Sequence, residues 1–74
     1  MRYVVKHKPT NKVYCEDEGG AYLIDPKDGC FSWGQKKDAD RALRDLQWQA
    51  DDNNGNLFTE DGEFPIGEFA VDKI

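Results

Sequence analysis

Carboxylates are the most frequent groups in this sequence that could act as acids or bases, and seven of the 15 occur in three short runs. These runs are Glu16-Asp17-Glu18, Asp51-Asp52 and Glu60-Asp61. Paired carboxylates work in acid–base catalysis when a pocket separates their pKa values. Here they lie in predicted turns, where water would solvate them. The one histidine, His7, is expected to be exposed between two lysines, and no nucleophile, phosphate-loop or zinc-protease motif occurs. The sequence therefore predicts no enzyme and no catalytic residue.

Part of the segment from Ala50 to Asp61 has the spacing of a calcium-binding loop. With Gly55 at the sharp turn, Asp52 and Asn54 fall on the third and fifth ligand positions. The first position is then Ala50, which has no side-chain oxygen, and the last is Asp61, which is shorter than the usual Glu. We therefore expect a solvated junction after a helix, with no metal site and no cofactor.

The two cysteines, Cys15 and Cys30, fall at apolar positions of predicted strands. Two cysteines are too few for a secreted disulfide framework, and together with His7 they offer too few ligands for zinc. We expect buried reduced thiols, with a disulfide between neighbouring strands as the alternative. Neither a signal peptide nor an apolar run long enough to cross a membrane is visible, so the sequence predicts a cytoplasmic protein.

One helix, predicted from Lys37 to Ala50, organises the chain. Its apolar residues recur at helical spacing, forming a narrow, alanine-rich stripe: Ala39, Ala42, Leu43, Leu46 and Ala50. Small side chains allow the helix to lie close to a sheet. Asp38 is a candidate N-cap, and Asn54-Gly55 is a stop signal.

Short strands make up most of the remaining chain. Residues 2–8 and 13–17 predict a first hairpin, and residues 21–24 and 30–33 predict a second. Residues 57–59 and 64 flank an Asp-Gly hairpin signal. Residues 68–74 predict a final strand that lies beside the first.

The predicted fold is α+β, with a small antiparallel sheet of four to five strands and one α-helix packed on one face, as a single domain over residues 1–74. The expected core is Val4, Val13, Cys15, Leu23, Ile24, Phe31, Leu43, Leu46, Phe69 and Val71. A core of this size gives roughly 3–5 kcal/mol of stability. A homodimer or a bound partner could add to it.

Charge is distributed unevenly along the chain. The net charge is −5, yet the first 14 residues carry four bases and no acid. The negative balance argues against general affinity for nucleic acid or for an anionic membrane.

Trp48 gives the strongest functional signal. It lies about 140° from Leu43 on a helical wheel, outside the core stripe. Exposed tryptophan is enriched at the centres of protein interfaces. The sequence thus predicts a protein-binding face made of Trp48, Asp38, Asp40, Arg41, Arg44, Asp45, Asp51, Asp52 and Trp33. Alternatively, Trp48 packs back onto Phe58 or Phe64 as part of the core.

The basic first hairpin carries a second hypothesis, direct binding of nucleic acid. Its bases could follow a phosphate backbone while its tyrosines stack on nucleobases. The residues are Arg2, Tyr3, Lys6, Lys8, Lys12 and Tyr14. The overall negative charge weakens such binding in physiological salt, and these bases could instead balance acids across the sheet.

In layout, the chain resembles very small phage-encoded host-takeover and anti-defence proteins, some anti-CRISPR proteins among them. The shared features are size, a short antiparallel sheet with one helix, an acidic balance and no catalytic motif. The resemblance implies a non-catalytic inhibitor that blocks a partner, such as a nucleic-acid-binding complex, through an acidic surface. It rests on no sequence motif and implies no residue roles. The basic first hairpin departs from the strongest acidic mimics.

Overall fold

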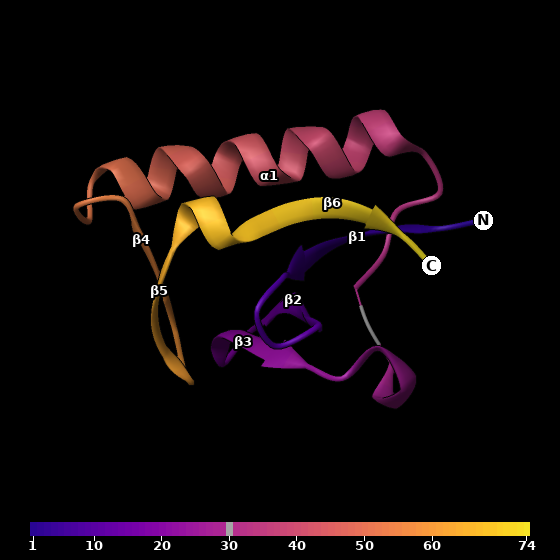
Figure 1. Ribbon diagram of the computed structural model, residues 1–74, viewed down its shortest axis with the longest axis horizontal. Coiled ribbons are helices and arrows are strands. Elements are labelled where there is room, and N and C mark those ends of the chain that lie inside the picture. Colours follow the sequence, from indigo (N-terminus) through magenta and orange to yellow (C-terminus); the bar gives the residue numbers. More distant parts are fainter. Residues whose placement is uncertain (30) are drawn as a thin grey trace.

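In the computed structural model, which describes residues 1–29 and 31–74, one helix lies across a face of a four-stranded antiparallel sheet (Figure 1). The helix is α1 (Lys36–Asp51). The sheet has the order β3-β2-β1-β6, from β3 (Gly20–Ile24), β2 (Lys12–Asp17), β1 (Tyr3–His7) and β6 (Phe69–Lys73). A separate hairpin consists of β4 (Asn56–Thr59) and β5 (Gly62–Pro65). Two short 3₁₀ segments are η1 (Pro26–Asp28) and η2 (Ile66–Glu68). The α+β class predicted from the sequence is confirmed.

Both faces of the sheet bury apolar side chains. The helix-side cluster is Val5, Tyr14, Leu23, Leu46, Leu57 and Phe69. The cluster on the other face is Val4, Val13 and Cys15, with Tyr22 and Ile24 packed against it. Successive residues of a strand point to opposite faces, so the neighbours Val4 and Val5 are both fully buried but in different clusters. Of the predicted core, six residues are buried, while Ile24, Leu43 and Val71 are half-buried.

Strand β1 has two partners along one edge. Near its end, Lys6 and His7 pair with β2, whereas at its start Tyr3 exchanges backbone hydrogen bonds with Trp33, at 2.8 and 2.9 Å. The opposite edge pairs with β6 over the whole of β1, as the sequence predicted. Strand β2 therefore pairs only with the end of β1. The segment before α1 pairs with the start of β1 through Trp33.

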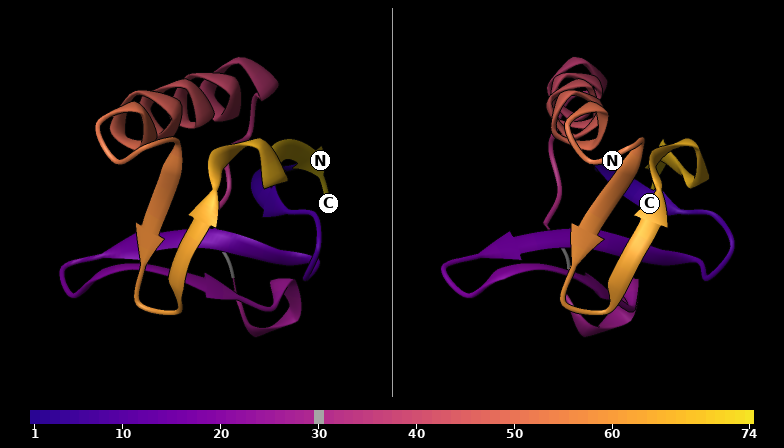
Figure 2. Two further views of the ribbon diagram at one scale, coloured as in Figure 1. Left: turned by 60° about the vertical axis from the view of Figure 1, so that its left-hand side comes forward. Right: turned by 90° about the vertical axis from the view of Figure 1, so that its left-hand side faces the viewer.

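The tip of the β4–β5 hairpin reaches the outer edge of β3. The backbone N–H of Glu60 donates to the Ala21 carbonyl at 2.8 Å, and the N–H of Leu23 donates to Asp61 Oδ2 at 2.9 Å. Figure 2 shows the hairpin crossing from the end of α1 towards β2 and β3. These contacts occupy backbone groups on an edge that a further strand would otherwise pair with.

This arrangement contradicts the predicted second hairpin. Residues 31–33 form no strand with β3, because that edge is engaged by the β4–β5 tip while Trp33 pairs with β1. Phe31, predicted in the core, is 52% exposed. Its N–H donates to Cys15 Sγ at 3.2 Å, and Cys15 is buried as expected. Cys30, with its predicted strand position and its pairing, lies outside the described residues.

The helix closely follows its predicted bounds but begins differently. Gln35 is the N-cap residue and its side chain makes no capping hydrogen bond, so the prediction that Asp38 caps the helix is wrong. At the other end, the N–H groups of Asn53 and Gly55 both donate to the Ala50 carbonyl at 2.8 Å. Asn54 and Gly55 have φ of +58° and +80°, the left-handed region that ends helices, so the predicted stop is confirmed.

The stripe of α1 packs on the sheet as predicted. Ala39, Leu46 and Ala50 are buried, and Ala42 and Leu43 are half-buried. Among the described residues, no helix has both the length and the apolar character to cross a membrane.

Candidate functional site

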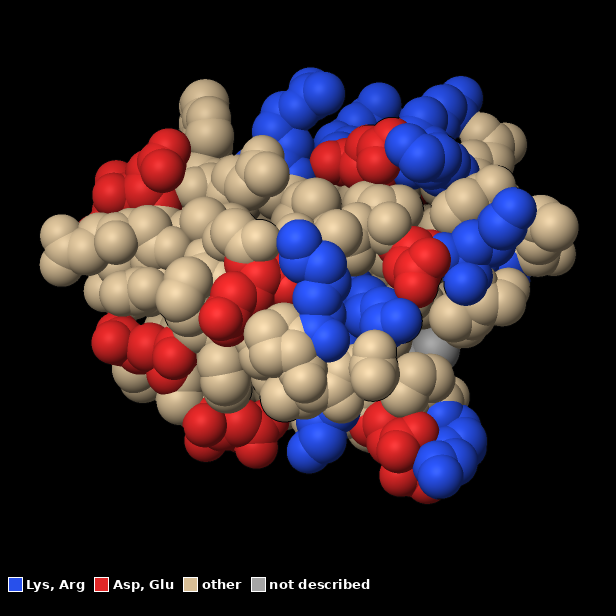
Figure 3. All heavy atoms as spheres, in the orientation of Figure 1, with Lys and Arg blue, Asp and Glu red and all other residues tan. Residues whose placement is uncertain are grey.

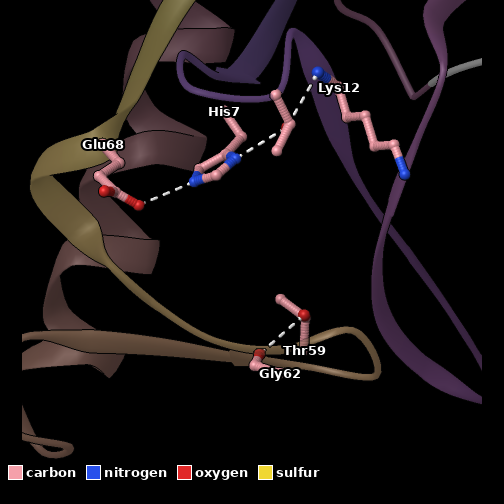
Figure 4. A network of polar contacts seen from close by, with 6 residues as sticks. His7, Lys12, Thr59, Gly62 and Glu68 are labelled. Atoms are coloured by element: carbon pink, nitrogen blue, oxygen red, sulfur yellow. Dashed lines mark hydrogen bonds and ion pairs between the residues drawn. The ribbon is translucent and has the colours of Figure 1, made fainter.

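His7 is buried, so the prediction of an exposed histidine is wrong. The residue is 2% exposed, and its side chain makes two hydrogen bonds (Figure 4). Nδ1 lies 2.8 Å from Thr10 Oγ1, and Nε2 lies 2.9 Å from Glu68 Oε1. The ring packs against Phe64 and Phe69, with centroid distances of 4.7 and 4.9 Å. His7 and Val5 are two residues apart on one strand and share a face, which is the sequence signal for this burial.

The order hydroxyl, imidazole, carboxylate is also that of a catalytic triad. Thr10 Oγ1 accepts a hydrogen bond from the N–H of Lys12 at 3.3 Å, and it can donate its own proton to His7 Nδ1. That tautomer leaves a proton on Nε2 for Glu68. The two phenylalanine rings and the low exposure deny a substrate access to the imidazole. We interpret the network as a junction that joins the β1–β2 turn to η2.

Trp48, in contrast to His7, lies at the surface and is 77% exposed. Phe58, one of its two predicted core partners, is 70% exposed. The alternative that Trp48 packs back into the core is therefore wrong. Trp48 instead lines a shallow hollow with Asp45, Gln49 and Asp52.

A deeper cavity lies between α1, β2 and the segment that pairs with the start of β1. It has a volume of about 190 Å³, and its lining consists of Tyr14, Glu16, Phe31, Trp33, Ala42, Asp45, Leu46 and Gln49. The cavity occupies the region where β2 separates from β1. The predicted interface residue Trp33 is half-buried here, with its ring centroid 5.2 Å from that of Phe31.

Tyr14 and Glu16 form the polar side of this cavity. The Tyr14 hydroxyl donates to Glu16 Oε2 at 2.8 Å. Burial, together with the hydrogen bond and the negative charge of Glu16, raises the pKa of Tyr14 well above its ordinary value. The hydroxyl is therefore a permanent donor, and one oxygen of Glu16 remains available to a second donor.

The cavity and the exposed aromatic side chains form one continuous surface. Gln49 lines the cavity, the hollow beside Trp48 and a third hollow beside Phe58. Asp45 lines the first two. We call this surface the aromatic face, defined as Phe31, Asp45, Trp48, Gln49, Asp52 and Phe58.

Charge is divided between the two halves of α1. All four bases of the helix lie between Lys36 and Arg44, and the chain from Asp45 to Asp72 has eight acids and no Lys, Arg or His. Figure 3 shows Lys and Arg gathered over the N-terminal part of the helix, and Asp and Glu towards its other end and the β4–β5 hairpin. Acids at a helix C-terminus oppose the helix dipole, by about 0.3–1 kcal/mol each. Helix stability therefore does not account for this placement.

The predicted protein-binding residues are thus only partly brought together. Asp45, Trp48 and Asp52 share one hollow, and Trp33 lines the adjoining cavity. The others lie along the helix outside these hollows: Asp38, Asp40, Arg41, Arg44 and Asp51. Asp40 pairs with Lys36 at 3.0 Å, within the half of the helix that carries its four bases.

Sequence reasoning missed three members of the aromatic face, Phe31, Gln49 and Phe58, and it missed Glu16, which lines the adjoining cavity. Phe58 had a usable signal, because it alternates on β4 with Leu57 and Thr59, which are both buried. For Phe31 the signal was misleading, since an aromatic residue beside Cys30 reads as a strand position.

The structure removes much of the predicted nucleic-acid surface. Tyr14 is 6% exposed, so its proposed stacking on nucleobases is wrong, and Tyr3 is half-buried. Lys6 Nζ pairs with Asp72 at 3.2 Å, and Arg2 donates to Ser32 Oγ at 2.6 Å. Lys8 and Lys12 are exposed, and so is Arg2 despite its contact with Ser32.

The described residues contain no group of three or more His, Cys, Asp or Glu side chains placed to hold a metal ion. The segment with partial calcium-loop spacing is divided between the end of α1 and the β4–β5 hairpin. No protein family, curated protein or solved structure matches the chain.

Proposed function

We propose that this protein is a non-catalytic binding protein that inhibits or modulates another protein by covering part of its surface. The observation that carries the proposal is the exposure of Trp48 on a well-formed helix. A tryptophan side chain buries about 150–250 Å² at an interface, and apolar burial contributes about 25 cal/mol per Å². An exposed Trp48 forgoes this contribution in the isolated protein and gains it on binding.

The charges around Trp48 indicate the kind of partner. Its hollow is lined by Asp45 and Asp52. Along the sequence, no base follows Asp45 until Lys73. Complementary charge increases the rate of association and selects the partner. The partner surface is therefore basic around an apolar centre, as at the nucleic-acid site of a regulatory or defence protein.

Trp48→Ala is the direct test. With the protein as bait in a cell lysate, we expect the captured partner to bind the variant at least about 30-fold more weakly, the effect of losing an interface hot spot. Affinities are measured by titration of the purified partner. Gln47→Ala is the matched control, because Gln47 is an exposed neighbour on the same helix. Equal binding by both variants would reject the proposal.

A further inference from the structure

The cavity beside α1 has walls of two kinds. Phe31, Trp33 and Leu46 provide an apolar lining, and Glu16 and Asp45 provide two carboxylates. Among the described residues, no base lines the cavity. An apolar cavity with uncompensated negative charge favours a group that carries a positive charge and also has a flat or aliphatic part.

The size of the cavity restricts what can enter. Its volume of about 190 Å³ is below the roughly 300–1,000 Å³ of sites that hold whole small molecules. A single side chain suits it better than a cofactor does. Its rim continues into the hollow beside Trp48 through Asp45 and Gln49, so a chain that covers Trp48 can insert a neighbouring side chain here.

We infer that this cavity binds an arginine side chain of the partner protein, next to the apolar group that covers Trp48. The guanidinium is planar, stacks on aromatic rings and donates two parallel hydrogen bonds to a carboxylate. Phe31 and Trp33 are the rings available for stacking, and their tilted contact already fixes one wall. Tyr14 occupies only Oε2 of Glu16, and among the described residues no hydrogen bond reaches Oε1, so Oε1 can accept one N–H of the guanidinium while Asp45 offers a second carboxylate.

The inference rests on the proposed function, since one partner supplies both groups. It is tested with the peptide acetyl-Gly-Arg-Gly-amide and its citrulline analogue, which has the same shape but no charge. In the Trp48→Phe variant, Trp33 is the single tryptophan, so its indole N–H signal in NMR spectra reports the cavity alone. We expect saturable shifts with the arginine peptide, with a dissociation constant in the millimolar range, and at least tenfold weaker binding of the citrulline peptide.

The carboxylates are tested by combining Glu16→Gln with Asp45→Asn, which should weaken arginine binding by at least tenfold. Both side chains are exposed, so the fold should persist, and circular dichroism checks this. Asp51→Asn is the control, because Asp51 is an exposed acid of the same helix outside the cavity. The inference would be overturned if the citrulline peptide bound as tightly as the arginine peptide. It would also be overturned if the same peptide with lysine in place of arginine bound equally tightly.

The two proposals fail separately. If Trp48→Ala abolishes partner binding but the cavity takes no arginine, the proposed function stands and the arginine site is rejected. If the cavity binds arginine but Trp48→Ala keeps the partner, the arginine site stands and the role of Trp48 is rejected.

Discussion

The β4–β5 hairpin carries two phenylalanines with opposite surroundings. Phe64 is half-buried and packs on the buried His7, whereas Phe58 is 70% exposed on the aromatic face. Their neighbours differ as well. The polar imidazole of His7 is buried beside Phe64, whereas the aromatic face that includes Phe58 exposes Trp48. Polar groups can be buried when each finds a hydrogen-bond partner, as both nitrogens of His7 do.

The two regions differ in when their side chains gain contacts. Side chains around His7 gain their contacts on folding, so their loss should lower the free energy of unfolding. Side chains of the aromatic face gain few contacts until a partner arrives. Substitutions in the two regions should therefore differ in what they change, and the sizes of the effects can be ranked.

The largest effect is expected for His7→Ala. It removes two hydrogen bonds and leaves a cavity between Phe64 and Phe69, a loss of about 2–4 kcal/mol. Each kcal/mol lowers the melting temperature of a domain of this size by about 4–8 °C. Thermal unfolding followed by circular dichroism should show a fall of about 8 °C or more. A shift below 3 °C would mean that the junction does not support the fold.

An intermediate effect is expected for Asp61→Ala, at the contact between the hairpin tip and β3. The change leaves the N–H of the buried Leu23 without its carboxylate partner, which costs about 1–3 kcal/mol. Hydrogen exchange of the Leu23 amide should accelerate. Glu60→Ala is the matched control, since Glu60 contacts β3 through its backbone N–H. Equal acceleration in both variants would contradict the role of Asp61.

The smallest effect is expected for Trp48→Ala and for Phe58→Ser. Both side chains are mostly exposed, so the free energy of unfolding should change by less than about 0.5 kcal/mol. Urea unfolding curves measure this. A loss comparable to that of His7→Ala would show that the aromatic face is part of the core, which contradicts its assignment as a binding surface.

Local patterns predicted the elements that depend on near neighbours. The helical spacing from Lys37 to Ala50, the Asn54-Gly55 stop and the first hairpin are all present in the fold. The position of Trp48 outside the core stripe also followed from helical geometry alone. The buried His7 could have been predicted, because strand alternation places it with Val5, but its charged neighbours suggested exposure.

Long-range competition between strand edges decided the rest. The sequence marked residues 30–33 as a strand but could not show that the β4–β5 tip, about thirty residues later, would engage the edge of β3. That contact leaves Trp33 to pair with β1, brings Phe31 to the surface and opens the cavity beside α1. The helix and its exposed tryptophan could be predicted because they depend on residues a few positions apart. The aromatic face could not, because Phe31 joins the helix residues and Phe58 only through the long-range pairing of Trp33 with β1.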